Sequence, residues 1–470
     1  MFLTNLVKNS LRTFFGMALL AGAAFAESNP PMPAALPEDL LPDLKRILEA
    51  AVKQSPTMLA RNLDVAQAEA NYIMDRAPML PSIAGSGSYS KSETRLDTPG
   101  SFPTKSDSFS YGLSASQPVF QWGALKYQRD ISKLQVAIAA KQYAEVYRTL
   151  AVNIRAQYLA LIQKKLVLRN TRFAQQMAES NLAIQEARLR DGRISSGDII
   201  NPRLAVDEAR IYSDRAEADY DQSRRLLALS AGVGEITDEM VPSSIPKPVY
   251  AAQTLAAYFD SFRADDFENT LMAGVYRDTI RQGELRYRVA RARLLPKINL
   301  SASYNYGNQS NLAQDGTGKL TIVQSATTSK YYGVYGYWTL FDGLATRGAK
   351  LSALAAKRLA EQNLESYKKT LSEQVRGLEK QIGFSGRLMD LTEIRLALAQ
   401  DGVKKVAGDV NNGVTPQSTL DSFTQMANKA ELDSVVARAD FLSRWSDYVS
   451  TLGVDPALQN LPARYFRNGK

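Results

Sequence analysis

The sequence predicts an internally duplicated α+β protein in which each half is a β-hairpin followed by a very long antiparallel helical hairpin. Three observations predict this fold. Landmark residues recur in the same order at a nearly constant spacing, four segments alternate between apolar and small polar residues, and long segments lack the residues that end helices. The chain has 470 residues, which is enough for more than one hydrophobic core.

Two matching halves are visible in the sequence. Residues Arg76–Ile83 resemble residues Arg291–Ile298, which lie 215 positions later. The remaining landmarks share a spacing of 221 residues: Val119-Phe120 with Leu340-Phe341, Gly192 with Gly413, and Gly232-Val233 with Gly453-Val454. The change from 215 to 221 places six extra residues in the second copy, between its proline and its phenylalanine.

The duplication divides the chain into parts. The first repeat covers residues 57–235 and the second covers 269–455, and each is predicted to hold an approach helix, two strands, a long helix and a return helix. Residues 236–268 are the predicted inter-repeat linker, or equatorial segment. Residues 27–56 are predicted to be an extended lead-in because five prolines lie between residues 27 and 42, and residues 456–470 form a tail.

Residues 1–26 are predicted to be a cleaved signal peptide. Lys8 and Arg12 precede an apolar run that ends in Ala24-Phe25-Ala26, a small-x-small cleavage pattern. The run is shorter than the ~20 apolar residues of a membrane-spanning helix, and no later segment offers such a length. We therefore expect an exported chain, whose net charge falls from +9 to +7 when Lys8 and Arg12 are removed.

The composition excludes several classes of function. The chain has no Cys and no His, so it lacks disulfides, thiol nucleophiles, a lipid-bearing N-terminal Cys and Ser-His-Asp relays. An acidic pair such as Asp265-Asp266 has no defined spacing for carboxylate catalysis, and no dense Lys/Arg patch for nucleic acid is present. We expect no enzyme, no catalytic residue, no cofactor and no metal site.

The four alternating segments suit strands that cross a membrane. The second and third are the clearest: Phe109, Tyr111, Leu113, Ala115 and Val119 share one face opposite a row of serines, and Ile298, Leu300, Ala302, Tyr304 and Tyr306 oppose Asn, Ser and Gly. The fourth segment, Tyr331–Phe341, is aromatic on both faces. Such strands need about 9–11 residues with one apolar face. A soluble sandwich would alternate equally well, but its polar face is usually charged rather than small.

Strand number then predicts an oligomer. Four strands cannot close a barrel in lipid, because the smallest membrane barrels have about 8 and open edges leave backbone groups unpaired. Two copies of the chain would supply 8 strands and three copies 12. An aromatic girdle is expected from the following residues: Tyr89, Trp122, Tyr331, Tyr332 and Trp338.

The long helices are predicted from the absence of breakers. Ala124–Asp191 contains neither Gly nor Pro, which allows a rod of roughly 100 Å. Ala345–Val410 has no Pro but six Gly, so we expect bends or breaks near Gly383 and Gly386.

Each rod ends in a turn that reverses the chain. Gly192 and Gly413 suit the position just after a helix, Ser196, Asp198 or Thr415 could cap the returning helix, and Pro416 suits its first turn.

The motifs occur in the same order in both halves, and together they resemble those of the TolC-type outer-membrane efflux and secretion channels. The resemblance covers about residues 57–455. Its motifs are Leu80-Pro81-Ser82-Ile83 and Leu295-Pro296-Lys297-Ile298 before the strands, Gln117-Pro118-Val119-Phe120 and Leu340-Phe341-Asp342-Gly343 after them, and Gly192–Asn201 and Gly413–Asp421 at the tips. Pro81, Pro118, Phe120, Pro296, Phe341 and Gly343 thus mark the turns between helices and strands.

The resemblance implies a homotrimer with one 12-stranded barrel in outer-membrane lipid and a periplasmic α-helical tunnel. The connecting segments Lys91–Asp107 and Asn308–Lys330 would face outside. The tips would dock a periplasmic adaptor (membrane fusion) protein and, through it, an inner-membrane transporter, for efflux or type I secretion. The docking residues implied are Gly192, Arg193, Ser195, Gly197, Asp198, Asn412, Gly413, Thr415 and Pro416.

The second tip departs from the family pattern. Asp198 stands six residues after Gly192 as expected, whereas Thr419 occupies that place after Gly413 and the nearest carboxylate is Asp421. Asp421 could line the tunnel entrance, or it could be a solvated carboxylate at the start of a helix. The alternative for the whole chain is a periplasmic or cell-surface coiled-coil protein without a pore.

Overall fold

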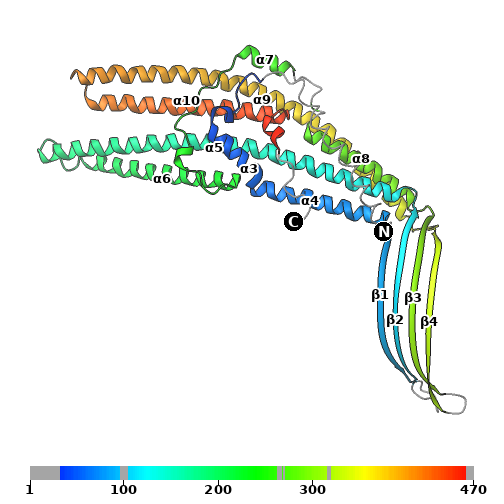
Figure 1. Ribbon diagram of the computed structural model, residues 1–470. Helices are drawn as coiled ribbons and strands as arrows, with labels where there is room; N and C mark the ends of the chain where they lie inside the picture. The colour runs from blue at the N-terminus through cyan, green and yellow to red at the C-terminus, as the bar shows by residue number, and fades with distance from the viewer. Residues whose placement is uncertain (1–31, 96–103, 262–266, 268–269, 315–318, 462–470) are drawn as a thin grey trace, which may run out of the picture. The chain divides into compact units, whose positions relative to one another are not determined.

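The structure is a computed structural model that describes residues 32–95, 104–261, 267, 270–314 and 319–461 (Figure 1). The predicted signal peptide therefore lies outside the described residues. The chain forms two compact units. The helical unit comprises residues up to Leu59, Val146–Thr270 and Thr370–Ala463, and the sheet unit comprises Ala60–Glu145 and Leu271–Lys369.

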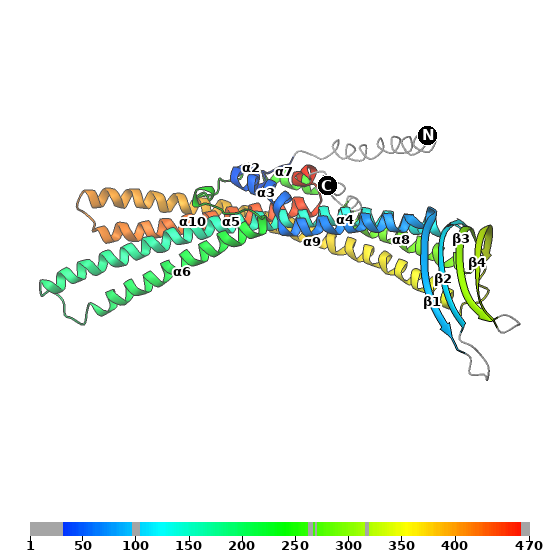
Figure 2. The same ribbon diagram turned by 60° about the horizontal axis from the view of Figure 1, so that its bottom comes forward.

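Two antiparallel helical hairpins make up most of the helical unit. The first joins α5 (Ala124–Arg190) to α6 (Ile200–Ala231), and the second joins α9 (Ala345–Asn411) to α10 (Gln417–Thr451). The parts of α5 and α9 in this unit begin at Val146 and Thr370. Figure 2 shows the hairpins side by side, with both tips at the same end.

Apolar side chains at helical spacing form the core of this unit. On α5, Ile154, Tyr158 and Leu161 are fully buried, as their three- and four-residue steps predict. On α10, Phe441, Trp445 and Tyr448 are also fully buried. The Trp445 ring stacks on Tyr448, with ring centroids 5.9 Å apart, and its indole donates to the Ala34 carbonyl over 3.0 Å.

The lead-in at 27–56 is mostly helical from Pro37 onward, so the predicted extended conformation is wrong for that part. It contains α2 (Pro37–Leu40) and α3 (Pro42–Gln54). Pro37 and Pro42 each open a helix, where a missing N–H costs nothing, and α3 buries an apolar face that includes Leu44, Ile47 and Ala51. The prolines therefore mark helix starts rather than an extended chain.

The linker between the repeats contains two short elements within residues 236–261, the part that is described without a gap. They are η2 (Asp238–Met240) and α7 (Ala252–Ser261), and the segment between them has no regular structure. Beyond α10, the described chain ends with η4 (Pro456–Asn460).

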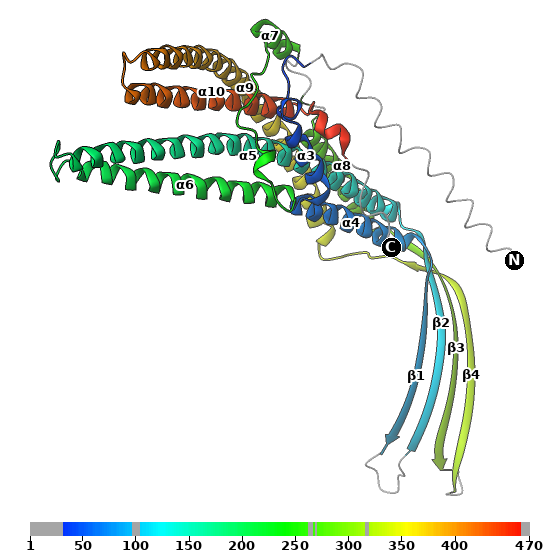
Figure 3. The same ribbon diagram turned by 60° about the vertical axis from the view of Figure 1, so that its left-hand side comes forward.

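The sheet unit contains four antiparallel strands in the order β1-β2-β3-β4 (Figure 3). The strands are β1 (Ser82–Thr94), β2 (Thr104–Phe120), β3 (Lys297–Gln314) and β4 (Leu320–Tyr337). The rest of the unit comes from α4 (Pro56–Arg76), η1 (Ala77–Met79), α8 (Leu271–Ala292) and the first parts of α5 and α9.

Polar contacts set the spacing of the helices in the sheet unit. Lys141 of α5 pairs with Asp278 of α8 over 2.6 Å, and Gln282 donates to the Ile131 carbonyl over 3.1 Å. Gly283 lets α8 approach α9, because a β-carbon there would lie 2.9 Å from Lys357.

The internal duplication is confirmed by matching geometry in both halves. Each half has an approach helix, two strands, a long helix and a return helix in the same order. Four glycines have left-handed φ angles at equivalent helix ends: Gly192 (69°), Gly413 (74°), Gly232 (72°) and Gly453 (76°). Each helix end closes with the same pair of backbone hydrogen bonds, as in Val233 N to Ala228 O and Val454 N to Val449 O.

The prediction of breaks near Gly383 and Gly386 is wrong, because α9 is continuous from Ala345 to Asn411. Gly386 has a packing role instead. A β-carbon at this position would lie 2.6 Å from the Tyr250 hydroxyl, so the glycine leaves room for Tyr250 of the linker. Tyr250 in turn donates to Asp390 of α9 over 3.0 Å.

The strands extend beyond their predicted limits. Most of Asn308–Lys330, expected as a loop, belongs to β3 and β4, and much of Lys91–Asp107 belongs to β1 and β2. The last strand ends at Tyr337, so Trp338–Phe341 lies outside it, contrary to the prediction. Polar residues continue the pairing here because both strands stay in register, as in Asn308 opposite Ala326. Among the described helices, none is both long and apolar enough to cross a membrane.

Candidate functional site

One face of the sheet is apolar along much of β2 and β3 and at the end of β4, but Lys330 and Thr328 of β4 oppose Tyr304 and Tyr306 on the same face. The register places Tyr111 opposite Tyr306, Leu113 opposite Tyr304, and Ala115 opposite Ala302. Tyr332 and Val334 of β4 continue these rows beside Ala302 and Leu300. Val119, predicted on this face, falls in a bulge, and Phe120 opposes Ile298 instead. Such a face suits lipid.

The opposite face is small and polar on β1, β2 and β3, whereas on β4 it carries Tyr331 and Tyr335, which oppose Ser303 and Asn299. Serine pairs bridge β1 and β2, with Oγ–Oγ distances of 2.8 Å for Ser82–Ser116 and 2.7 Å for both Ser88–Ser110 and Ser90–Ser108. On β3 the face continues through Asn299, Ser301, Ser303 and Asn305. A small polar face is typical of a water-filled barrel interior.

The turns from strand to helix have the same unusual backbone in both repeats. Trp122 and Gly123 have φ angles of 53° and 77°, and Gly343 and Leu344 have angles of 62° and 70°. Each repeat therefore places two successive left-handed residues before its long helix but puts glycine at a different one of the two positions. A turn of this kind needs positive φ at both positions, so Trp122 and Leu344 are the strained members.

The sequence-predicted turn residues lie at the helical end of the sheet. Pro81 and Pro296 directly precede β1 and β3, Pro118 lies at the bulge of β2, and Phe341 lies in the exposed segment after β4. Two indoles fasten this end: Trp122 donates to the Pro296 carbonyl over 2.7 Å, and Trp338 donates to the Leu294 carbonyl over 2.9 Å.

Both helical tips are built alike. Arg193 N donates to Arg188 O and Val414 N donates to Asp409 O, each over 2.8 Å, so Gly192 and Gly413 take their predicted places after the helices. The tips are largely exposed, and Val414 is 75% exposed. Exposed apolar groups beside polar turns are typical of interaction surfaces.

The predicted helix caps are wrong. Neither α6, which starts at Ile200, nor α10, which starts at Gln417, has a side-chain cap, and Pro416 precedes the first turn of α10. Asp198 instead closes the turn before α6, since one of its oxygens accepts from both the backbone N–H and the hydroxyl of Ser195 over 2.8 Å. These hydrogen bonds hold the pKa of Asp198 below its ordinary value.

The remaining tip residues surround these turns. Arg193, Ser195, Gly197 and Asn412 are exposed, and Thr415 is half-buried. Asp421 lies in the first turns of α10 and accepts from Gln417 over 3.0 Å. Its role at a tunnel entrance stays a prediction.

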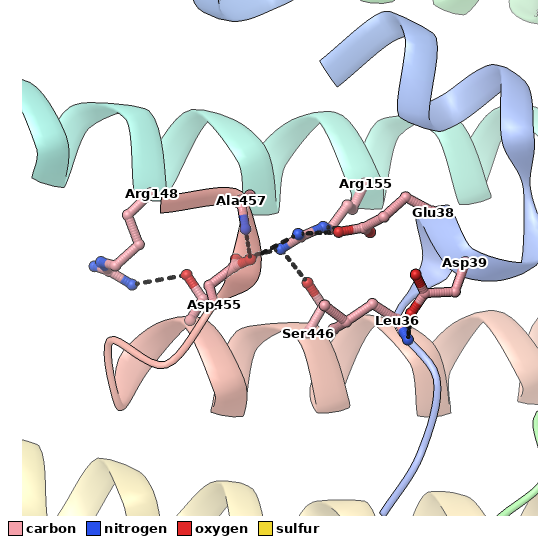
Figure 4. Close-up of polar contacts among 9 residues, drawn as sticks. Leu36, Glu38, Asp39, Arg148, Arg155, Ser446, Asp455 and Ala457 are labelled. Atoms are coloured by element: carbon pink, nitrogen blue, oxygen red, sulfur yellow. Dashed lines mark hydrogen bonds and ion pairs between the residues drawn. The ribbon is translucent and has the colours of Figure 1, made fainter. Parts of the chain in front are cut away.

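A buried charged cluster in the helical unit could not be found from the sequence. Arg155 of α5 is fully buried and donates to Glu38, Asp455 and Ser446 (Figure 4). Its hydrogen bonds to Asp455 measure 2.6 and 3.0 Å. The partners lie 117, 300 and 291 positions away, so no local pattern connects them.

The environment of this cluster shifts two pKa values. Burial raises the pKa of Glu38, and the nearby guanidinium opposes that shift. Burial also works against the charge of Arg155, but hydrogen bonds and attraction to Asp455 and Glu38 outweigh it and raise the pKa of Arg155. The guanidinium therefore stays charged, and it links the N-terminal lead-in and the C-terminal segment to α5.

A second set of contacts joins the two hairpins nearer the tips. Arg169 of α5 pairs with Glu431 of α10 over 2.5 Å, and Asn170 donates to the Asn428 carbonyl over 3.1 Å. A groove of about 390 Å³ between the same helices is lined by Phe173 and Leu432, among others. These contacts can set the separation of the hairpins.

The geometry defines a class of protein. A sheet with one apolar face, one polar face and two unpaired edges suits a subunit of a shared membrane barrel, and the helical hairpins extend the chain beyond the membrane. No group of three or more acidic residues placed to hold a metal ion occurs within the described ranges.

The sequence comparisons define this class more closely. The chain matches the outer membrane efflux protein family over residues 47–233 and 278–453, and it belongs to that family. It is similar to the pyoverdine export outer membrane protein OpmQ of Pseudomonas putida, with 26% identity over 362 residues, 72% of this chain and 70% of the relative. OpmQ of Pseudomonas aeruginosa is 28% identical over 285 residues, 57% of this chain and 56% of that relative.

The fold agrees with this assignment. The Campylobacter jejuni CmeC outer membrane channel superposes with a TM-score of 0.68 at 14% identity, over 92% of this chain and 90% of that one. The protein is thus an outer-membrane export conduit with a long periplasmic helical part. The alternative of a coiled-coil protein without a pore receives no support.

Proposed function

We propose that three copies of the chain form a passive duct whose tips dock a periplasmic adaptor protein, which connects the duct to an inner-membrane transporter. The observation that carries the proposal is that the outer edges of β1 and β4 are unpaired in this sheet. The sheet also has one apolar face, which suits lipid, and one polar face, which suits water. Three such sheets supply 12 strands and leave no edge in lipid.

The tips support adaptor docking. They combine rigid glycine-ended turns with exposed side chains such as Arg193 and Val414. Passive conduction follows from the absence, in the sequence, of any nucleotide-binding loop of the G-x-x-x-x-G-K-[ST] type. The energy for export must then come from the partner.

The cargo that fits best is a small secreted molecule. The two curated relatives are named for pyoverdine export, and the family is named for efflux. We propose the same class of cargo, small exported metabolites, rather than secreted proteins.

Cross-linking from the tips tests the docking. Because the chain has no Cys, a cysteine introduced as Ser195→Cys or Thr415→Cys is its only thiol. A short thiol-to-amine cross-linker applied in cells should then join the channel to a periplasmic protein, identified by mass spectrometry as an adaptor. Thr254→Cys, exposed on α7 and away from the tip turns, is the control. Equal cross-linking at all three positions would contradict docking at the tips.

A further inference from the structure

The helical end of the sheet carries a surplus of cations. Within ten residues of the strand ends on this side stand seven Lys or Arg and three Asp. Arg76, Lys126, Arg291 and Arg293, named here the basic collar, are all exposed. Arg76, Lys126 and Arg291 form no ion pair with any residue that the structure describes. Protein carboxylates therefore do not pair with these three side chains, whereas Arg293 interacts electrostatically with Asp342.

The far end of the sheet is different. There Lys91 pairs with Asp107 over 3.6 Å and Lys105 pairs with Glu93 over 3.8 Å, across neighbouring strands. Charge is thus balanced at the outer end and positive at the helical end. An asymmetry of this kind matches a membrane whose periplasmic surface presents phosphate groups.

The collar lies at the depth of lipid headgroups. Trp122 and Trp338 are hydrogen-bonded at this end of the sheet, where indoles favour the membrane–water interface. Arg291 and Arg293 stand at the end of α8 and just after it, a few residues before Leu294 and Pro296, whose carbonyls accept these bonds. Their side chains can therefore reach headgroup phosphates.

An apolar groove lies on the apolar face of the sheet, near its helical end. Its volume is about 410 Å³. It is lined by Ala115 and Ala302, which lie directly opposite each other, by Leu300, Tyr332 and Val334, and by Ser116, Gln117, Ser301 and Gly333. Pro81, five positions after Arg76, also lines it. Small residues between large ones leave room for one hydrocarbon chain.

We infer that the basic collar and this groove together bind an anionic glycerophospholipid of the periplasmic leaflet. The guanidinium groups bind the phosphate, for which their planar donors are suited, and an acyl chain fills the groove. The inference rests on the membrane orientation and trimer of the proposed function. It adds a lipid site that fixes the depth of the barrel.

Quenching of tryptophan fluorescence by brominated lipids tests the site. The chain has three tryptophans, of which Trp122 and Trp338 are at the collar and Trp445 is fully buried in the helical unit. The trimer is reconstituted in phosphatidylcholine, and brominated phosphatidylglycerol or brominated phosphatidylcholine is added. We expect phosphatidylglycerol to bind several-fold more tightly, and Arg76→Gln/Arg291→Gln/Arg293→Gln to lower that preference at least about 5-fold.

Matched variants separate the outcomes. Arg188→Gln/Arg190→Gln/Arg193→Gln removes the same charge at a tip and should leave the preference unchanged, and Lys substitutions at the collar should largely retain it. Ala115→Leu/Ala302→Leu should weaken quenching by both lipids. The inference is overturned if the collar variant keeps the preference for phosphatidylglycerol. It is also overturned if added inorganic phosphate displaces the bound phosphatidylglycerol.

A collar variant that alters only the ion selectivity of the pore would also overturn the inference, because the arginines would then face the tunnel. Size-exclusion of each sample reports the trimer separately, so failure of the lipid site and failure of the channel are distinguishable.

Discussion

At the scale of single residues, Arg155 shows how distant parts of the chain depend on one buried group. Its guanidinium forms ion pairs with both Glu38 of the lead-in and Asp455 of the C-terminal segment, and its side chain has no exposed surface. One guanidinium is shared by two carboxylates, and the backbone N–H of Ala457 also donates to Asp455, over 2.9 Å. Removal of the cation would therefore strand two acids in the core.

We expect Arg155→Met to destabilise the helical unit by about 3–5 kcal/mol, the usual cost of breaking a buried ion pair from one side. The midpoint of thermal unfolding in detergent measures this. Arg172→Met is the control, because Arg172 pairs with Glu217 on the surface, where both side chains are about half exposed. A midpoint no lower than that of the control would show that the cluster is not needed for stability.

The lowered pKa of Asp238 predicts that the stability of the folded protein depends on pH. A hydrogen bond from Tyr220 over 2.6 Å and a weaker contribution from Lys165 hold the pKa of Asp238 below 3.8. A carboxyl with a lowered folded-state pKa contributes stability above its unfolded pKa and loses it as pH falls through the folded value. Asp238→Asn should therefore lower the unfolding midpoint more at pH 6 than at pH 3. An equal effect at both pH values would contradict the assignment.

At the scale of elements, sequence patterns located the helices and strands but not all of their ends. The three- and four-residue steps on α5 correctly predicted the burial of Tyr158, and alternation correctly placed Tyr111 and Ser110 on opposite faces. The limits of β3 and β4 were missed because Asn, Gln and Thr there resemble a loop, and only pairing between neighbours keeps them in strands.

The glycines of α9 show the same limit. The sequence alone predicts that each glycine destabilises the helix. It does not show that Gly386 makes room for Tyr250, because Tyr250 lies 136 positions earlier in the chain. The tip glycines were predictable because their left-handed φ is a local property of helix ends. The Arg155 cluster was not predictable, because its members meet only after the whole unit has folded.

Two substitutions in α9 test this packing role. Gly386→Ala should lower the unfolding midpoint, because its new methyl displaces the Tyr250 hydroxyl from Asp390 at a cost of about 1–2 kcal/mol. Gly377→Ala meets no atom within 4 Å and should raise the midpoint, since alanine favours helix by up to ~1 kcal/mol. If both variants shifted the midpoint in the same direction, Gly386 would have only a backbone role.

At the scale of the whole molecule, we expect conduction through the proposed trimer to depend on how far the two hairpins can separate. The Arg169–Glu431 pair and the Asn170–Asn428 contact both join α5 to α10, and they lie between the Arg155 cluster and the tips in the sequence of α5. Contacts at such a position can hold the tunnel closed while the cluster keeps the base of the hairpins fixed.

We expect Arg169→Ala and Glu431→Ala each to raise the resting single-channel conductance in planar bilayers. The double variant should raise it no further than either single variant, because both remove the same interaction. Arg172→Ala, which breaks a pair between α5 and α6 within one hairpin, should leave conductance unchanged. A rise in the control equal to that in the test variants would contradict a role for contacts between hairpins.

The central claim is that the four-stranded sheet is one third of a closed barrel. Native mass spectrometry of the protein extracted from the outer-membrane fraction in mild detergent tests it most directly. If three chains share the barrel, a single species with the mass of three mature chains is expected, which supplies 12 paired strands. A soluble monomer or dimer that needs no detergent would leave β1 and β4 as open edges and would contradict the shared barrel.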